Sequence, residues 1–171
     1  MSNPYLEVTK QIKEDMFPFI LGVMVLISIF SIWISAACGQ TPLEVAQCEI
    51  GRGETIANNR GPDIKRYGAD GQPWCAAFVS YCAKKAGMNI PYTLRVKDYL
   101  RLGKCVASPR AGDLIVFTRQ GGGHIGIVEK VEGNKITTIE GNTGEFPSKV
   151  KRITYRNRPK NLLGYIRLAK K

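Results

Sequence analysis

The hydrophobic pattern of the chain changes after Cys105. Before it, apolar positions fall in segments bounded by helix caps and glycines; after it, short apolar or β-branched runs alternate with turn residues. Helices that precede strands indicate an α+β domain with an antiparallel sheet rather than alternating βαβ units. The pattern predicts helices near residues 42–50, 62–67, 73–86 and 93–102, and strands near residues 114–117, 125–128, 135–139, 150–155 and 165–166.

The first of these helices has a start signal of its own. Thr41 can act as the N-cap, Pro42 suits the first helical position, and Glu44 can complete a capping box. Gly51 then marks the end of the helix.

The segment DGQPWCAAFVSYCAKKAG, residues 70–87, predicts another helix. Its last turn carries two lysines, and Gly87 can end it in a left-handed cap. The helix is expected to begin at Pro73 or Trp74, which places Cys75 in its first turn.

Residues 16–38 are predicted to form a transmembrane helix. The stretch carries no charge up to Ala37, and a helix of this length spans about 33 Å, enough for a bilayer core of about 30 Å. Two other interpretations stay open, a lipoprotein site that would be acylated at Cys38 and a cleaved signal peptide. The expected organisation is a leader at residues 1–15, the membrane span, and one domain at residues 41–171.

The chain is strongly basic, with 25 Lys or Arg against 14 Asp or Glu and a net charge of +11. Every charged residue from Lys149 to the C-terminus is basic. This basic C-terminal tail is either a solvated strand surface or a site for an anionic polymer or anionic lipid. Nucleic acid is not an expected partner, because aromatic side chains scarcely interleave the basic ones.

A cysteine in the first turn of a helix is placed for chemistry. The positive end of the helix dipole and the unpaired N–H groups stabilise a thiolate, which is the nucleophilic form of the thiol. The same N–H groups can hold the oxyanion that forms when a carbonyl is attacked. Cys75 is therefore a candidate nucleophile. Among Cys48, Cys82 and Cys105 at most one disulfide can form, and the sequence does not say which.

The single histidine, His124, opens an apolar run directly after three glycines. A cysteine nucleophile needs a base that later gives its proton to the leaving amine, and imidazole titrates in the required range. One imidazole is too few for a metal site, so neither a metal nor a cofactor is expected.

Glu140 and Asn142 are candidates for the group that orients His124. A two-residue turn at residues 133–134 would place residue 127 opposite Glu140, so that Glu140 would point away from His124. A catalytic triad therefore requires a loop with an odd number of residues, or a bulge in one strand.

Four motifs follow one another in the chain: GQPWCAAFV at residues 71–79, GDLIVF at residues 112–117, GHIGIV at residues 123–128 and IEGN at residues 139–142. In this order they resemble the CHAP family of cysteine- and histidine-dependent amidohydrolases and peptidases, which are papain-like, and the stretch before Cys75 resembles its phage-associated branch. The resemblance covers roughly residues 43–168. It implies N-terminal helices packed on an antiparallel sheet and cleavage of amide bonds in peptidoglycan.

The same resemblance implies residue roles. Cys75 would be the nucleophile, His124 the general base and acid, Glu140 the group that orients His124, and Asn142 its polar support. Gln72 and Trp74 are expected near the substrate or the oxyanion.

Taken together, the sequence predicts a membrane-anchored peptidoglycan hydrolase, either an endopeptidase or an N-acetylmuramoyl-L-alanine amidase. Residues 16–38 would hold it in a bacterial inner membrane with the domain on the periplasmic or outer side, or in a virion membrane, where it could serve phage lysis or entry. Two alternatives stay open: a non-catalytic basic membrane protein that binds a polyanion, and a papain-like acyltransferase that uses the same residues.

Overall fold

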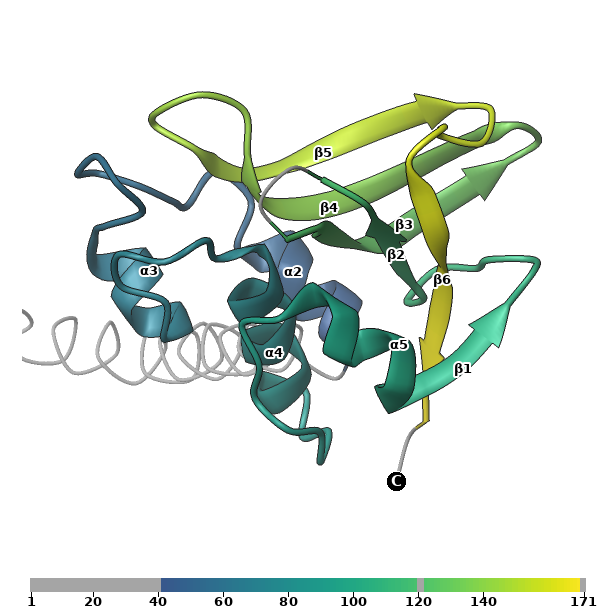
Figure 1. Cartoon of the computed structure of the whole chain (residues 1–171), viewed down its shortest axis with the longest axis horizontal. Helices are drawn as coiled ribbons and strands as arrows, with labels where there is room; N and C mark the ends of the chain where they lie inside the picture. Colours follow the sequence, from purple (N-terminus) through teal and green to yellow (C-terminus); the bar gives the residue numbers. More distant parts are fainter. Residues whose placement is uncertain (1–40, 120–121, 170–171) are drawn as a thin grey trace, which may run out of the picture. The chain divides into compact units, whose positions relative to one another are not determined.

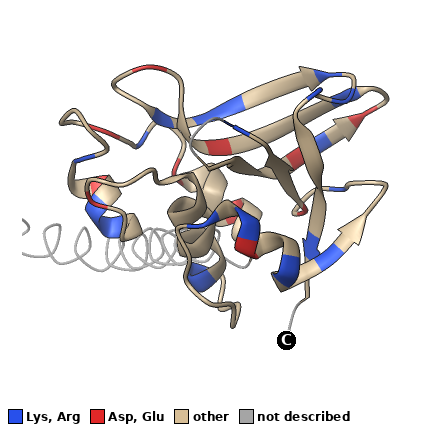
Figure 2. Ribbon diagram, in the orientation of Figure 1, with Lys and Arg blue, Asp and Glu red and all other residues tan. Residues whose placement is uncertain are grey.

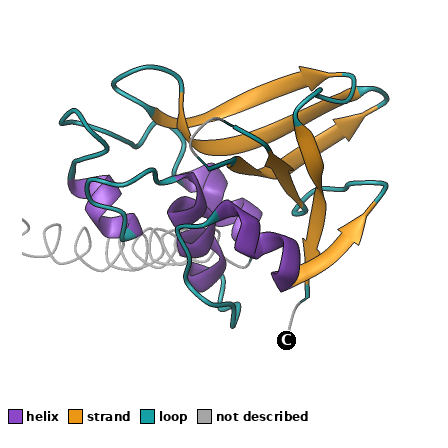
Figure 3. Ribbon diagram, in the orientation of Figure 1, coloured by secondary structure: helices purple, strands orange, loops and turns teal. Residues whose placement is uncertain are grey.

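The computed structural model describes residues 41–119 and 122–169. Helices come first and strands follow, as Figures 1 and 3 show, so the predicted α+β class is confirmed. The helical elements are α2 (Pro42–Cys48), α3 (Pro62–Tyr67), α4 (Cys75–Lys85), the 3-10 turn η1 (Val96–Asp98) and α5 (Tyr99–Leu102). The strands are β1 (Gly103–Val106), β2 (Leu114–Phe117), β3 (His124–Glu132), β4 (Lys135–Thr143), β5 (Lys149–Arg156) and β6 (Leu162–Leu168).

The six strands form one antiparallel sheet in the order β1-β6-β2-β3-β4-β5. Every predicted strand is present, and β3 and β4 are longer than expected. Strand β1 was not predicted, because its four residues are largely exposed and carry no alternating apolar pattern. It is extended because it pairs with β6, from Gly103 opposite Leu168 to Val106 opposite Tyr165.

The predicted start of α2 is confirmed, and α4 begins within two residues of its predicted start. At α2 the Thr41 hydroxyl accepts a hydrogen bond from the Glu44 N–H at 3.2 Å, and the Glu44 carboxylate accepts one from the Thr41 N–H at 2.9 Å. Helix α3 ends at Gly68 in a left-handed cap. Helix α4 begins at Cys75, with Trp74 as its N-cap residue.

The main core lies between the helices and one face of the sheet. Helix α4 contributes Phe78, Val79 and Cys82, all fully buried, and it packs across β3 and β4. The opposite face of the sheet covers a smaller apolar cluster that includes Phe117 and Val128. Cys75, Cys82 and Cys105 are free, so none of them forms a disulfide with Cys48.

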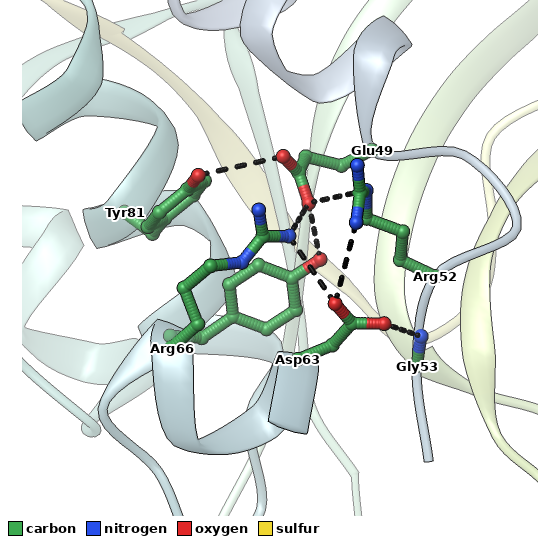
Figure 4. Close-up of polar contacts among 7 residues, drawn as sticks. Glu49, Arg52, Gly53, Asp63, Arg66 and Tyr81 are labelled. Carbon is green, nitrogen blue, oxygen red and sulfur yellow. Dashed lines mark hydrogen bonds and ion pairs between the residues drawn. The ribbon is translucent and has the colours of Figure 1, made fainter. Parts of the chain in front are cut away.

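A buried carboxylate holds the helices together (Figure 4). Glu49, just after α2, accepts a hydrogen bond from the Tyr67 hydroxyl of α3 at 2.7 Å and one from the Tyr81 hydroxyl of α4 at 3.4 Å. The guanidinium groups of Arg66 and Arg52 form ion pairs with the same carboxylate. A buried charge is tolerated only when it is paired in this way, so the network fixes α3 and α4 relative to α2.

The basic C-terminal segment lies largely in the two strands that the sequence predicts near residues 150–155 and 165–166. Residues 149–168 form β5 and β6 within the sheet, so their Lys and Arg side chains are carried by strands (Figure 2). Two of them are paired with acids: Arg152 with Glu129 at 2.7 Å and Arg167 with Asp113 at 2.7 Å.

The predicted membrane span at residues 16–38 and the leader before it lie outside the described residues. Among residues 41–119 and 122–169, no helix has the length and apolar character needed to cross a bilayer.

Gly141 of β4 allows α4 to approach the sheet closely. A Cβ at this position would lie 2.7 Å from Trp74 Cζ3 and 3.0 Å from the Phe78 Cβ. Gly141→Ala is therefore expected to lower the free energy of unfolding by about 1–3 kcal/mol, because these buried rings must move. Thermal unfolding of the full-length protein, followed by near-UV circular dichroism, measures the effect.

Gly164→Ala is the matched control, since the nearest atom to its added Cβ would be Cys105 Sγ at 3.7 Å. Equal melting temperatures for the two variants would contradict the close approach at Gly141.

Candidate active site

Cys75 is the first residue of α4, as the sequence predicts, and only 5% of it is exposed. Among the described residues, no side chain caps the N-terminus of this helix. The first amides of a helix have no intrahelical acceptor, so the N–H groups at the start of α4 remain available to a ligand beside the thiol. The α2 start, which Thr41 caps, lacks this property.

His124 is the first residue of β3, at the end of the sheet where α4 begins. Its Nε2 lies 2.8 Å from Glu140 Oε2 of the neighbouring strand β4. The ring of Phe117 stacks on the imidazole, with the centroids 6.1 Å apart. Because Nε2 faces Glu140, Nδ1 is the ring nitrogen left to face Cys75, and the interaction with Cys75 contributes to the raised pKa of His124.

Glu140 is 1% exposed, yet both of its oxygens have partners. Oε1 accepts hydrogen bonds from the Thr138 hydroxyl at 2.6 Å and from the Tyr155 hydroxyl at 2.9 Å, while Oε2 meets His124. Burial alone would raise the pKa of Glu140, but the hydrogen bonds and the His124 charge lower it overall. Glu140 is therefore an anion held rigidly behind the imidazole.

The pKa of His124 is raised to about 9. Burial acts to lower this pKa, but hydrogen bonds and charge interactions with Cys75 and Glu140 outweigh it. At neutral pH the imidazole is therefore protonated. His124 is hydrogen-bonded to Glu140, interacts with Cys75 and carries a transferable proton.

A β-bulge aligns Glu140 with His124. The β3–β4 hairpin closes with a two-residue turn, which by itself would turn Glu140 away from the imidazole. Glu129 is an extra residue in β3, and it shifts the pairing so that Gly126 lies opposite Glu140. The sequence required either a loop with an odd number of residues or a bulge, and the structure contains the bulge.

The bulge is fixed from two sides. Arg152 of β5 donates two hydrogen bonds to the Glu129 carboxylate, at 2.7 and 2.9 Å, and Gln47 of α2 donates a third at 3.0 Å. The neighbouring Val128 N–H donates to the Asp113 carbonyl at 2.7 Å, away from the β4 ladder. The side chain of the extra residue is therefore held by α2 and β5.

Gly126 makes room for the carboxylate. A Cβ at this position would lie 2.5 Å from Glu140 Cγ, so any larger residue would push Glu140 off the imidazole. Gly126, the second glycine of the GHIGIV motif, thus allows Glu140 and His124 to align.

Three other residues singled out from the sequence lie elsewhere. Trp74 is fully buried, stacks on Tyr67 at 5.7 Å and donates its indole N–H to Glu54 at 3.2 Å, so its side chain lies in the core and its part near the substrate or the oxyanion stays a prediction. Asn142 has a φ of +58° and its amide oxygen accepts a hydrogen bond from Ser148 rather than contacting His124. Gln72 is exposed in the turn before α4, and its part in an oxyanion site stays a prediction.

Sequence reasoning missed two neighbours of this site. Glu54 is buried and links the Trp74 indole to the Ser148 N–H, which ties the start of α4 to β5. Arg119, after β2, places one guanidinium nitrogen 3.5 Å from His124 Nδ1. Neither residue belongs to a motif or an apolar pattern, so no local signal in the sequence identifies them.

No group of three or more His, Cys, Asp or Glu side chains in the described ranges is arranged to hold a metal ion.

Comparison with known proteins supports the family resemblance. Residues 67–142, which include Cys75, His124 and Glu140, match the family model of the CHAP domain. No curated protein matches the chain.

Three solved structures of mycobacterial proteins are similar. The P60 domain of an antigen from Mycobacterium avium subspecies paratuberculosis superposes with a TM-score of 0.50 at 15% identity, covering 77% of this chain and 94% of that structure, which indicates a shared fold. The peptidoglycan hydrolase RipB from Mycobacterium tuberculosis has a TM-score of 0.49 at 18% identity, over 75% of this chain and 63% of RipB. RipD from the same organism, a non-catalytic NlpC/p60 domain protein, has a TM-score of 0.49 at 16% identity, over 75% of this chain and 95% of RipD.

The raised pKa of His124 can be measured without assignment, because the chain has one histidine. Proton NMR of the imidazole is expected to show a midpoint near pH 9. In Glu140→Gln the pKa should fall by about 1–3, because an amide cannot neutralise the imidazolium. A midpoint near 6.5 in the unaltered protein, or no change in the variant, would contradict the charged pair.

Proposed function

We propose that this chain is a peptidoglycan hydrolase that cleaves an amide bond with Cys75 as the nucleophile. The observation that carries the proposal is the interaction of Cys75, at the uncapped start of α4, with an imidazole that is hydrogen-bonded to Glu140. The CHAP match over residues 67–142 supports the same chemistry, and RipB, a structural neighbour, is itself named a peptidoglycan hydrolase.

The first half of the reaction is acylation of Cys75. The thiolate attacks the carbonyl carbon of the substrate amide, forming a C–S bond while the C=O electron pair moves to oxygen. The backbone N–H groups at the start of α4 donate to this oxyanion. The imidazolium of His124 then gives its proton to the amide nitrogen, the C–N bond breaks, and the amine leaves behind a thioester.

The second half restores the enzyme. Neutral His124 accepts a proton from a water molecule as the water oxygen attacks the thioester carbonyl. The C–S bond breaks, the carboxylic acid product leaves, and Cys75 returns to the thiolate beside protonated His124. Glu140 keeps the imidazole oriented throughout and stabilises its charged form, without itself touching the substrate.

The finer assignment is part of the proposal. The bond that is cut lies either within the wall peptide, as for an endopeptidase, or between N-acetylmuramic acid and L-alanine, as for an amidase. We propose that residues 16–38 anchor the enzyme in a membrane, with the domain on the side that faces the wall, as a phage lysis or entry enzyme would require. The exposed Lys and Arg of β5 are suited to holding it near an anionic wall polymer or lipid surface.

Cys75→Ala is expected to abolish release of soluble muropeptides from purified sacculi, because it removes the proposed nucleophile at the start of α4. Mass spectrometry of the released fragments measures the loss and identifies the bond. Cys105→Ala, which removes an exposed free thiol on β1, is the matched control and should keep full activity. Equal release by the Cys75→Ala variant and the unaltered protein would contradict the proposal.

The pKa of His124 also sets the alkaline limit of activity. Because the pKa is raised to about 9, the imidazole keeps its proton below this pH and loses it above. The kcat/KM for a soluble wall peptide should therefore fall as pH rises through about 9. In Glu140→Gln this alkaline fall in kcat/KM should move to lower pH. A fall at an unchanged pH would show that it does not report the titration of His124.

A further inference from the structure

A pocket of about 210 Å³ opens next to His124 on the sheet side of the site, away from the helices. Its walls include Arg119, Thr143, Tyr155 and Asn161, and His124 and Glu140 form its inner end. A second pocket of about 190 Å³ lies on the other side of Arg119 and contains Lys97. Arg119 borders both pockets.

The loop that carries Arg119 is anchored to the sheet. The Thr118 N–H and hydroxyl both donate to the Asn161 carbonyl, at 2.8 and 3.2 Å. The Asn161 side-chain amide donates back to the Thr118 carbonyl at 3.0 Å. The base of the Arg119 side chain is therefore fixed at the entrance of the pocket.

The charges around the pocket leave one cation without an anion. Glu140 is the acid among the lining residues, and its charge is matched by protonated His124 and by two hydroxyl donors. None of the ion pairs formed by the described residues includes Arg119. The second pocket adds Lys97 and no acid.

The contact of Arg119 with His124 does not neutralise the positive charge of the guanidinium. The guanidinium has no acceptor atoms, and it can donate to His124 Nδ1 only when that nitrogen carries no proton. In the protonated form, which the reaction requires before the amine leaves, Nδ1 is a donor too. The two cations then repel at 3.5 Å, and an anion bound to the exposed Arg119 would relieve this repulsion.

We propose that Arg119 binds a free carboxylate of the substrate peptide beside the scissile amide, and that the enzyme thereby selects acidic wall peptides. A guanidinium matches a carboxylate with two parallel hydrogen bonds, and the pocket is large enough for one short acidic side chain or chain end. This inference rests on the proposed function, because it names the substrate class of the same site.

Binding to the inactive full-length Cys75→Ala protein tests the inference without turnover. The probes are the tetrapeptide L-Ala-γ-D-Glu-L-Lys-D-Ala and its analogue in which both carboxylates are carboxamides. The acidic peptide is expected to bind about 10- to 100-fold more tightly, as for a hydrogen bond between charged groups in a partly buried site. Adding Arg119→Gln should remove this preference, and Arg119→Lys should restore part of it.

Arg101→Gln in the same background is the matched control. It removes an equal charge from the exposed face of α5, outside both pockets, and should leave the preference unchanged. Proton NMR of His124 in the Arg119→Gln variant verifies that the site is intact. The inference is overturned if the two peptides bind equally, if neither binds, or if the preference survives Arg119→Gln.

Hydrolysis separates this outcome from the proposed function. If the Cys75 enzyme cuts sacculi but shows no preference for the acidic peptide, the carboxylate site alone is wrong. If the preference depends on Arg119 but sacculi are not cut, the hydrolase assignment fails and a carboxylate-binding site remains.

Discussion

The alignment of His124 with Glu140 depends on one extra residue in β3. Side chains alternate between the faces of a sheet, so a hairpin with a two-residue turn assigns each residue to a face by counting alone. Without the bulge at Glu129, the carboxylate of Glu140 would enter the apolar core under α4, where a charge without partners costs several kcal/mol. With it, Glu140 and His124 share a face and neutralise each other. The contacts of Glu129 with Arg152 and Gln47 are therefore part of the site, although they lie at a distance from the reacting atoms.

Burial strengthens the attraction between His124 and Glu140, and it also requires hydrogen-bond donors for the carboxylate. A carboxylate that is 1% exposed requires donors for both oxygens, and Thr138 and Tyr155 supply those that His124 does not. The low local dielectric strengthens the attraction to the imidazolium and keeps the proton on His124 well above neutral pH. Gly126 completes the arrangement, since it provides the space that the Glu140 side chain occupies.

The nucleophile reaches this pair from the helical layer, and buried acids fix its position. Glu49 joins α2, α3 and α4 (Figure 4). Glu54 holds the indole of Trp74, the residue directly before Cys75. The site thus has two rigid halves, a helix start and a strand start. They meet beside Arg119, whose charge has no anionic partner among the described residues and gives the site its affinity for acidic groups.

The sequence by itself determined the helix starts, the strands from β2 to β6 and the candidates Cys75, His124 and Glu140, because caps, β-branched runs and short motifs are local properties of the chain. It also showed that a triad needed an odd loop or a bulge, but not which of the two. Only the tertiary structure decided that, because the bulge is held by α2 and β5, which are distant in the chain. It likewise placed the Trp74 side chain in the core, joined Asn142 to Ser148, and brought Arg119 to the imidazole. These outcomes depend on which distant segments pack together, and no local pattern records that.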